Sequence, residues 1–174
     1  GNMFSSPENN NSKESMFALQ WKAIATEWGT QNTNQAYIVP ALTGITGGGD
    51  GWGVYLPSIS LQAGFEPKDI RKKNTIMTDG DFYSELLKNS GGFTYKKILS
   101  STGANFRKYI VGSAAERNDV FFMRTSQNTI ILRYSDVLLM NSEAIMAGAP
   151  STTSAAALST FNQVRSRAGL PPKM

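Results

Sequence analysis

The stretch TDGDFY holds two carboxylates, Asp79 and Asp81, which are spaced like the first ligands of a calcium-binding loop. Such a loop also needs further oxygen ligands and a terminal glutamate, and no acidic residue follows at the expected distance. An Asp-Gly pair is itself a common turn signal. We therefore interpret TDGDFY as a turn, and the sequence predicts no metal site.

Few catalytic side chains are available, because the chain contains neither histidine nor cysteine. A Ser-His-Asp triad, a HExxH zinc site, thiolate nucleophiles, disulfides and iron–sulfur clusters are therefore excluded. Paired carboxylates could still hydrolyse glycosides. The candidates show no convincing arrangement for that reaction, namely Asp50, Glu66, Asp79 and Asp81. We expect no catalytic residue and no cofactor.

The composition is typical of one globular domain with many turns. Hydrophobic residues make up 40% of the 174 residues and charged residues only 17%, with a net charge of +4. The basic residues form short clusters at 71–73, 96–97 and 165–167, which we interpret as solvated surface. Nucleic acid is therefore not an expected partner. No apolar run is long enough to span a bilayer, and no signal peptide is visible.

Residues 14–129 are predicted to be loop-rich, after a polar and mobile lead-in at 1–13. The alternation in SMFALQW (15–21) predicts a short half-buried strand, and PSISLQAGFE (57–66) predicts a short helix with an apolar side. FTYKKILS (93–100) predicts a further strand. The glycine-rich stretch GGGDGWG, which ends at Gly53, predicts a permissive loop.

The pattern changes at Ile130, from which a helical period predicts the first helix of a hairpin spanning 130–170. Its apolar residues cover so much of the circumference that we expect it to be buried between neighbours. Gly148 and Pro150 are expected to end it, and Thr152 or Thr153 to cap the second helix. A short connection predicts antiparallel packing.

The ordered motifs of the chain resemble the SusD/RagB family of Bacteroidetes outer-membrane lipoproteins. The strongest are NTIILRYSDVLLMNSEAIMAGA and ALSTFNQVRSRAGLPP, and upstream pieces such as ESMFALQW, WGTQNTNQAY, GWGVYLPS and LQAGFEPKDIRKKNTIM follow in the same order. The resemblance covers nearly all of residues 14–172. It implies a mainly α fold with TPR-like scaffold helices, a long loop-rich region and a few short strands. Because family members are longer, residues 1–174 are expected to form a single, incomplete domain of this family.

The resemblance also implies a function, which is non-catalytic capture of an oligosaccharide at the cell surface. The ligand would be delivered to a SusC-like TonB-dependent transporter in the outer membrane. Attachment to that membrane would be through a lipid anchor that lies outside this chain. Peptide or other nutrient capture, as in the RagB branch, and a structural TPR-like interaction module are the alternatives.

Aromatic side chains are the expected ligand contacts, because sugar rings stack on flat aromatic faces while polar groups bind the hydroxyls. Trp52 and Tyr55 are the first candidates, although packing of Trp52 against the helices is the competing interpretation. Tyr37 is left between a core role and a ligand role. The full set of predicted ligand-binding residues is Trp52, Tyr55, Trp28, Asn32 and Asp50. Arg133, Asp136 and Glu143 are interpreted as structural, with Arg165 and Arg167 as their partners.

Overall fold

A computed structural model of the chain describes residues 3–4, 7–22, 32–47, 51–113, 115–118, 120–121 and 124–174. The helices are α1 (Asn34–Ile38), α2 (Ile59–Ala63), α3 (Arg71–Thr75), α4 (Tyr134–Met146) and α5 (Ala155–Arg167). The strands are β1 (Ser15–Leu19), β2 (Ile76–Met77), β3 (Phe82–Tyr83), β4 (Phe93–Thr94), β5 (Asn105–Phe106), β6 (Val120–Phe121), β7 (Arg124–Thr125) and β8 (Thr129–Arg133). Helices account for more of the described residues than strands, which confirms the mainly α prediction.

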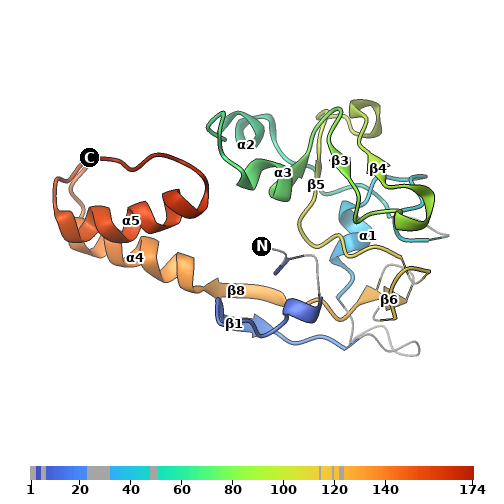
Figure 1. The fold of residues 1–174 in the computed structure, drawn as a ribbon, viewed down its shortest axis with the longest axis horizontal. Helices are drawn as coiled ribbons and strands as arrows, with labels where there is room; N and C mark the ends of the chain where they lie inside the picture. Colours follow the sequence, from blue (N-terminus) through green and yellow to red (C-terminus); the bar gives the residue numbers. More distant parts are fainter. Residues whose placement is uncertain are drawn as a thin grey trace.

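The described strands pair only two by two, all antiparallel, as β1–β8, β2–β5, β3–β4 and β6–β7. The hairpin of α4 and α5 extends to one side, and the loop-rich region lies on the other (Figure 1). Strand β8 connects them, because it runs out of the loop-rich region directly into α4. The loop-rich region holds the hydrophobic core, formed by Ile38, Val39, Ile45, Met77, Tyr83, Leu86, Phe93, Tyr95 and Ile110.

The first helix of the hairpin begins at Tyr134, so the predicted start at Ile130 is wrong. Residues 129–133 form β8 instead, pairing with β1. The change from strand β8 to helix α4 is stabilised by Asp136. Its carboxylate accepts hydrogen bonds from the Arg133 backbone N–H (2.9 Å) and from the Arg133 guanidinium (2.7 Å). A carboxylate in the first turn satisfies a free N–H at the helix start and favours the helix dipole.

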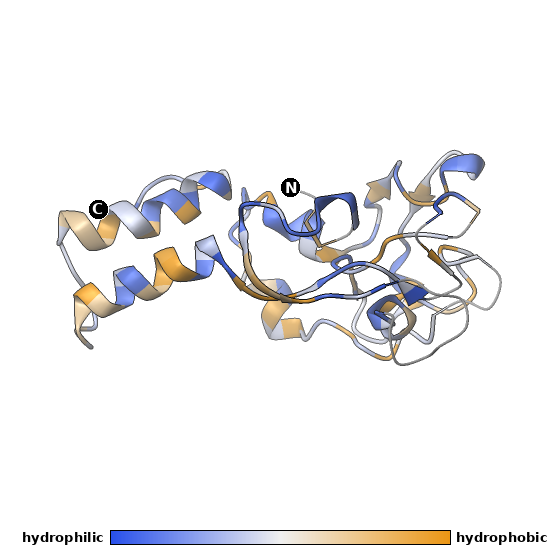
Figure 2. Cartoon of the chain, turned by 90° about the horizontal axis from the view of Figure 1, so that it is seen from below, coloured by the Kyte–Doolittle hydropathy of each residue, from blue (hydrophilic) through white to orange (hydrophobic). Residues whose placement is uncertain are grey.

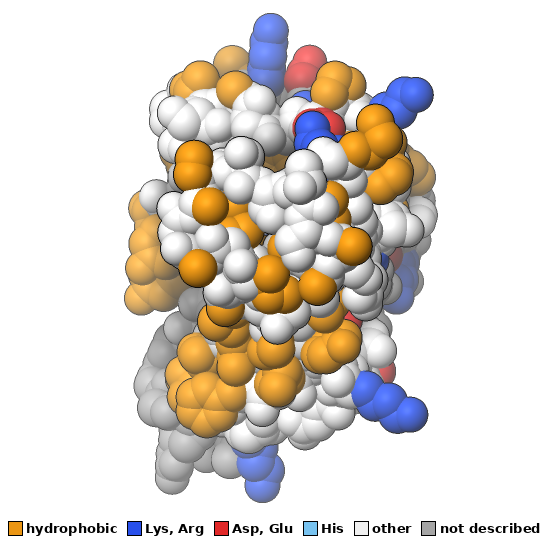
Figure 3. Space-filling model, turned by 90° about the vertical axis from the view of Figure 1, so that its left-hand side faces the viewer, with side chains coloured by type: hydrophobic (Ala, Val, Ile, Leu, Met, Phe, Trp, Pro, Cys, Tyr) orange, Lys and Arg blue, Asp and Glu red, His pale blue; other side chains and the backbone are white. Residues whose placement is uncertain are grey.

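The hairpin packs on itself but leaves much of its apolar surface open. Its buried residues are Ser135 and Ser142 on α4 and Ala157 and Arg165 on α5. The prediction that α4 is buried between neighbours is therefore wrong for the described chain. Figure 3, which looks onto the hairpin end, shows apolar side chains gathered on this face, and Figure 2 shows apolar residues along both helices. The exposed large apolar residues of α4 are Tyr134, Leu139, Met140 and Ile145.

The second helix is capped differently at its two ends. Ser154, rather than Thr152 or Thr153, is the N-cap residue, and its N–H donates to Thr152 Oγ1 (3.0 Å). At the C-terminus Gly169 adopts φ +74°, and Leu170 N–H donates to the Arg165 carbonyl (3.0 Å). This is the Schellman arrangement, which glycine favours because it adopts positive φ without strain.

The short elements agree only in part with the sequence predictions. Strand β1 is confirmed, but Phe17 is 61% exposed, so the strand is not half-buried through that side chain. The helix predicted within 57–66 is confirmed as α2, with Ser58 Oγ accepting from Leu61 N–H at 3.1 Å. The strand predicted over 93–100 is limited to β4 and is followed by a 3-10 turn at Lys97–Leu99.

The two carboxylates of TDGDFY are used inside the protein, as expected of a turn. Asp81 accepts hydrogen bonds from the backbone N–H (2.7 Å) and hydroxyl (2.8 Å) of Thr78, and Asp79 accepts from Lys97 N–H (2.8 Å). Within the described ranges no group of three or more His, Cys, Asp or Glu residues could hold a metal ion. None of the helices in the described part has both the length and the hydropathy to cross a bilayer.

Candidate functional site

Three aromatic side chains meet on the surface of the loop-rich region, and we call Tyr37, Trp52 and Tyr55 the aromatic cluster. The ring of Tyr55 stacks on that of Tyr37, with centroids 5.0 Å apart and an interplanar angle of 16°. The ring of Trp52 meets Tyr37 edge to face, at 4.9 Å and 73°. Both are preferred aromatic geometries, so Tyr37 orients both neighbours.

The backbone of helix α1 brings these residues together. Tyr37 lies on α1, and its carbonyl accepts hydrogen bonds from the N–H groups of Val54 (2.8 Å) and Tyr55 (2.9 Å). The N–H of Trp52 donates to the carbonyl of Ala36 in the same helix. The segment 51–55 is therefore held against the C-terminal end of α1, where helix carbonyls have no partner within the helix.

The two glycines of GWG allow this close approach. A Cβ on Gly51 would lie 2.5 Å from the carbonyl oxygen of Val39, a distance that no side chain can occupy. Gly53 adopts φ +57°, a conformation that costs a residue with a side chain about 1–2 kcal/mol. The glycines thus let the backbone lie directly on α1 while the side chain between them, Trp52, stays on the surface.

Both predicted ligand contacts remain accessible to solvent. Trp52 is 52% exposed and Tyr55 is 53% exposed, whereas Tyr37 is half-buried beneath them. Single exposed apolar residues are ordinary, but here two large exposed rings are both held against a third. Their orientations are therefore fixed before a ligand arrives. Trp52 does pack against a helix, through Tyr37 of α1, as the competing interpretation expected, but it stays half exposed and is not a core residue.

Buried amides of the sequence run before Tyr37 hold α1 in position. Asn32 is buried, and its side chain donates to the Gln127 carbonyl (2.6 Å) and accepts from Asn34 N–H (2.9 Å). The carbonyl oxygen of the buried Gln35 side chain accepts from Val111 N–H at 3.0 Å. Buried amides need such partners, so these side chains have a structural role. We leave Asn32 out of the proposed site.

The other predicted contacts fall differently. Trp28 and Asp50 lie outside the described residues, so the site consists of Trp52 and Tyr55 with Tyr37 beneath them. The central position of Tyr37 was not predicted, because nothing in the spacing between Tyr37 and Trp52 indicates that they touch. The only local signal is GWG, whose glycines indicate that some backbone lies close by.

The two arginines of α5 have partners outside the hairpin, contrary to the prediction that they pair with Arg133, Asp136 and Glu143. Arg133 pairs with Asp136 (2.7 Å), as expected for a structural pair. The Arg165 guanidinium, however, binds Glu66 in the loop-rich region (2.6 Å), and Arg167 binds Glu14. Because Arg165 donates to it, the pKa of Glu66 is held below its usual value. These arginines therefore join the hairpin to the rest of the chain.

Comparison with known proteins gives a consistent family assignment. The SusD family matches residues 13–174. A SusD-like protein of Bacteroides ovatus is 34% identical over 169 residues, covering 95% of this chain and 30% of that protein. SusD-like protein P2 of Formosa agariphila is 27% identical over 174 residues, covering 97% of this chain and 33% of that protein.

Solved structures agree with this assignment. A crystal structure with xylogluco-oligosaccharide superposes with a TM-score of 0.83 at 33% identity, covering 99% of this chain and 34% of that one. A SusD superfamily protein from Parabacteroides distasonis superposes with a TM-score of 0.70 at 23% identity, covering 99% of this chain and 35% of that one, and supports the fold alone. The chain spans about a third of the length of the curated relatives that it matches. It belongs to the SusD family.

Proposed function

We propose that this chain contributes to the capture of an oligosaccharide, without chemical change to it, and that the aromatic cluster is the contact surface. The observation that carries the proposal is the exposed pair Trp52 and Tyr55, fixed in place by the ring of Tyr37. Sugar rings present patches of C–H to aromatic faces, so exposed rings that are already ordered bind without a large entropic cost.

Family membership supports the same class of ligand. One relative of known structure, 33% identical, was solved with xylogluco-oligosaccharide. We propose that the longer protein resides on the outer-membrane surface through a lipid anchor and passes its ligand to a SusC-like TonB-dependent transporter. These roles follow from the family, whereas the binding contact is proposed from the residues of this chain.

The test is a calorimetric titration of the chain with soluble glycans, xylogluco-oligosaccharide first, and with short peptides. We expect saturable binding of one glycan class. Trp52→Ala and Tyr55→Ala should each weaken it about tenfold, because one aromatic contact contributes about 0.5–1.5 kcal/mol beyond its buried area. Tyr134→Ala, which removes a similarly exposed aromatic side chain from α4, is the matched control and should leave affinity unchanged.

Two results would overturn the assignment. A chain that binds glycans equally well without Trp52 and Tyr55 would place the contact surface elsewhere. A chain that binds short peptides and no glycan would replace sugar capture with peptide capture.

A further inference from the structure

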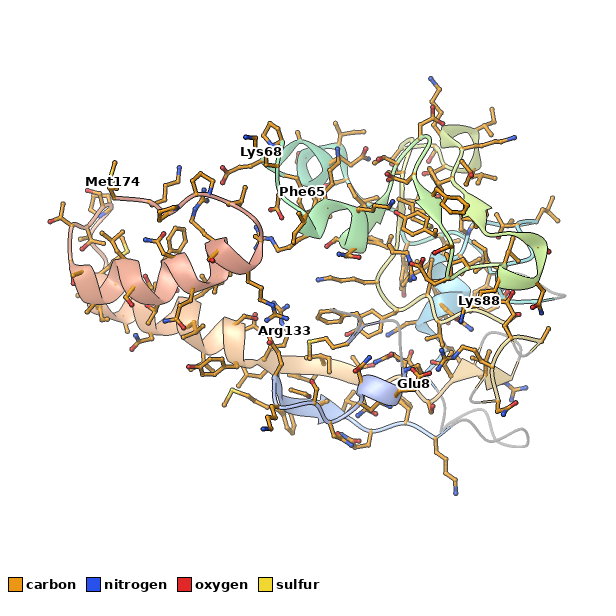
Figure 4. All side chains as sticks on the ribbon, in the orientation of Figure 1. Glu8, Phe65, Lys68, Lys88, Arg133 and Met174 are labelled. Atoms are coloured by element: carbon orange, nitrogen blue, oxygen red, sulfur yellow. The ribbon has the colours of Figure 1, made fainter. Side chains whose placement is uncertain are left out.

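A cleft of about 560 Å³ lies apart from the aromatic cluster, between the hairpin and the α2–α3 segment. Figure 4 shows Phe65 on one side of this space and Arg133, at the junction of β8 and α4, on the other. Phe4, near the start of the chain, also lines this cleft. The volume falls within the range of small-molecule sites, which is about 300–1,000 Å³.

The walls of the cleft combine apolar side chains with polar and charged ones. Leu61, Phe65 and Ile70 line one side, and Leu139 of α4 and Val164 of α5 line the other. Leu61, Ile70 and Leu139 are exposed in the described chain. Ligand sites commonly combine such walls with a few polar groups that fix orientation.

The charges in the cleft do not balance. Each of its four arginines forms an ion pair with a carboxylate, and the pairs are Arg71–Asp69, Arg107–Glu85, Arg133–Asp136 and Arg167–Glu14. Lys108 also lines the cleft, and it has no ion pair with any carboxylate of the described residues. One cation is therefore left without a counter-charge.

The environment of Lys108 makes the lack of a counter-charge unfavourable. Its ammonium lies 4.3 Å from the ring centroid of Phe4, and the Arg133 guanidinium lies 5.4 Å from the same ring. Burial, and then the positive charges of Arg133 and Arg71, lower the pKa of Lys108, while Asp136 opposes them. Asp136 is already bound to Arg133. The Phe4 ring gives the ammonium a cation–π contact but no counter-charge, so an anion would stabilise this partly buried cation further.

A second polar group in the cleft also lacks a partner. Ser135, at the start of α4, is 7% exposed, and its hydroxyl has no hydrogen-bond partner among the described residues. Buried hydroxyls are normally bonded, so an orphaned one that lines a cavity indicates a group that is supplied from outside. A hydroxyl and an ammonium can both donate to a carboxylate.

We propose that this cleft binds a hexuronate, with the Lys108 ammonium and the Ser135 hydroxyl donating to its carboxylate. The sugar ring would lie against Leu61, Ile70 and Leu139. Because each of the four arginines is already paired with a carboxylate, Lys108 is the cation left for the ligand. This site is separate from the aromatic cluster. The carboxylate is inferred from Lys108 and Ser135, whereas the choice of a sugar as its carrier rests on the proposed function.

The test uses D-glucuronate and D-galacturonate as probes in a calorimetric titration of the chain. D-Glucose and D-galactose are the neutral controls, and acetate supplies a carboxylate without a sugar ring. We expect at least one hexuronate to bind, with an affinity at least tenfold higher than that of acetate or of its neutral sugar. Repeating the titration with Lys108→Met and with Trp52→Ala separates the two sites. Loss of binding in Lys108→Met alone supports the cleft, whereas loss in Trp52→Ala alone would place the hexuronate on the aromatic cluster and overturn the inference.

Variants identify the donors. Lys108→Met should weaken hexuronate binding at least tenfold, Ser135→Ala several-fold, and Lys108→Arg little, because the charge remains. Lys97→Met removes an exposed lysine outside the cleft and should have no effect. Saturating hexuronate should also raise the pKa of Lys108, followed by NMR of its side chain, because a nearby carboxylate favours the charged form.

The inference would be overturned if neither hexuronate bound more tightly than acetate and the neutral sugars. It would also be overturned if Lys108→Met kept full affinity. Thermal unfolding of Lys108→Met provides the folding control. We expect its unfolding midpoint to lie at or above that of the unmodified chain, because the variant removes a partly buried charge that has no counter-charge.

Discussion

The hairpin has the longest helices, whereas the loop-rich region has most of the buried apolar side chains. Helices α4 and α5 are the longest regular elements of the described chain, yet their buried residues are two serines, an alanine and an arginine. The loop-rich region has only short elements, yet it contains the whole hydrophobic core cluster. Regular secondary structure and tertiary burial are thus concentrated in different halves of the molecule.

This difference shows that helical periodicity predicts an element and not its packing. The apolar residues of α4 repeat as they would in a buried helix, but only α5 packs along it in the described chain. In the loop-rich region, residues far apart in sequence are held by buried polar side chains, such as Asn105, whose amide donates to the Ile38 carbonyl at 3.2 Å. Such long-range pairs leave no periodic pattern.

The largest expected effect comes from a core truncation in the loop-rich region. Leu86 is fully buried, so Leu86→Ala should lower the free energy of unfolding by about 2–5 kcal/mol. Ile145→Ala on α4 is the matched change, because Ile145 is 41% exposed, and its cost should be about 1 kcal/mol or less. Urea unfolding of both variants measures the difference. Equal losses in the free energy of unfolding would show that apolar side chains of the hairpin stabilise the fold as much as the core of the loop-rich region does.

An intermediate effect is expected at the end of α5. Gly169→Ala should destabilise by about 1–2 kcal/mol, because the position has φ +74°, in the left-handed region. A Cβ there would also lie 3.3 Å from Ile70 Cγ2 in the loop-rich region.

Gly148→Ala is the control for that variant, since Gly148 has φ +84° but no atom near the position of an added Cβ. Its cost, also measured by urea unfolding, should be smaller than that of Gly169→Ala. The same cost at both positions would mean that contact between the hairpin and the loop-rich region contributes nothing at Gly169.

The smallest effect is expected from the ion pair between the two regions. The Arg165 guanidinium lowers the pKa of Glu66 from its usual 4.5, so the stabilisation by this pair is complete above pH 4.5. It is lost as the pH falls through the lowered pKa, because the folded state then takes up the proton. Glu66→Gln should remove this part of the pH dependence of the unfolding midpoint.

Glu143→Gln is the control, because Glu143 is exposed on α4 and forms no ion pair with a described residue. It should show the same pH dependence as the unmodified chain. If Glu66→Gln did so too, the contact between Glu66 and Arg165 would not stabilise the fold in solution.

Local signals in the sequence predicted much of the secondary structure and part of the site. Pro57 and the apolar residues after it predicted α2, Gly148 predicted the end of α4, and the Asp-Gly pair predicted the turn at 79–80. The start of α4 was placed too early because residues 130–133 continue its apolar pattern. Their pairing with β1, far away in the sequence, makes them a strand instead.

The sequence by itself determined the hairpin, the absence of histidine and cysteine chemistry, and the choice of Trp52 and Tyr55, because each depends on residue type or local spacing. Only the tertiary structure decided that Tyr37 orients both rings, that Asn32 is buried, and that Lys108 and Ser135 line one cleft. The physical reason is that contacts between distant segments are selected by packing and by the pairing of buried polar groups. Neither is encoded in a short stretch of chain.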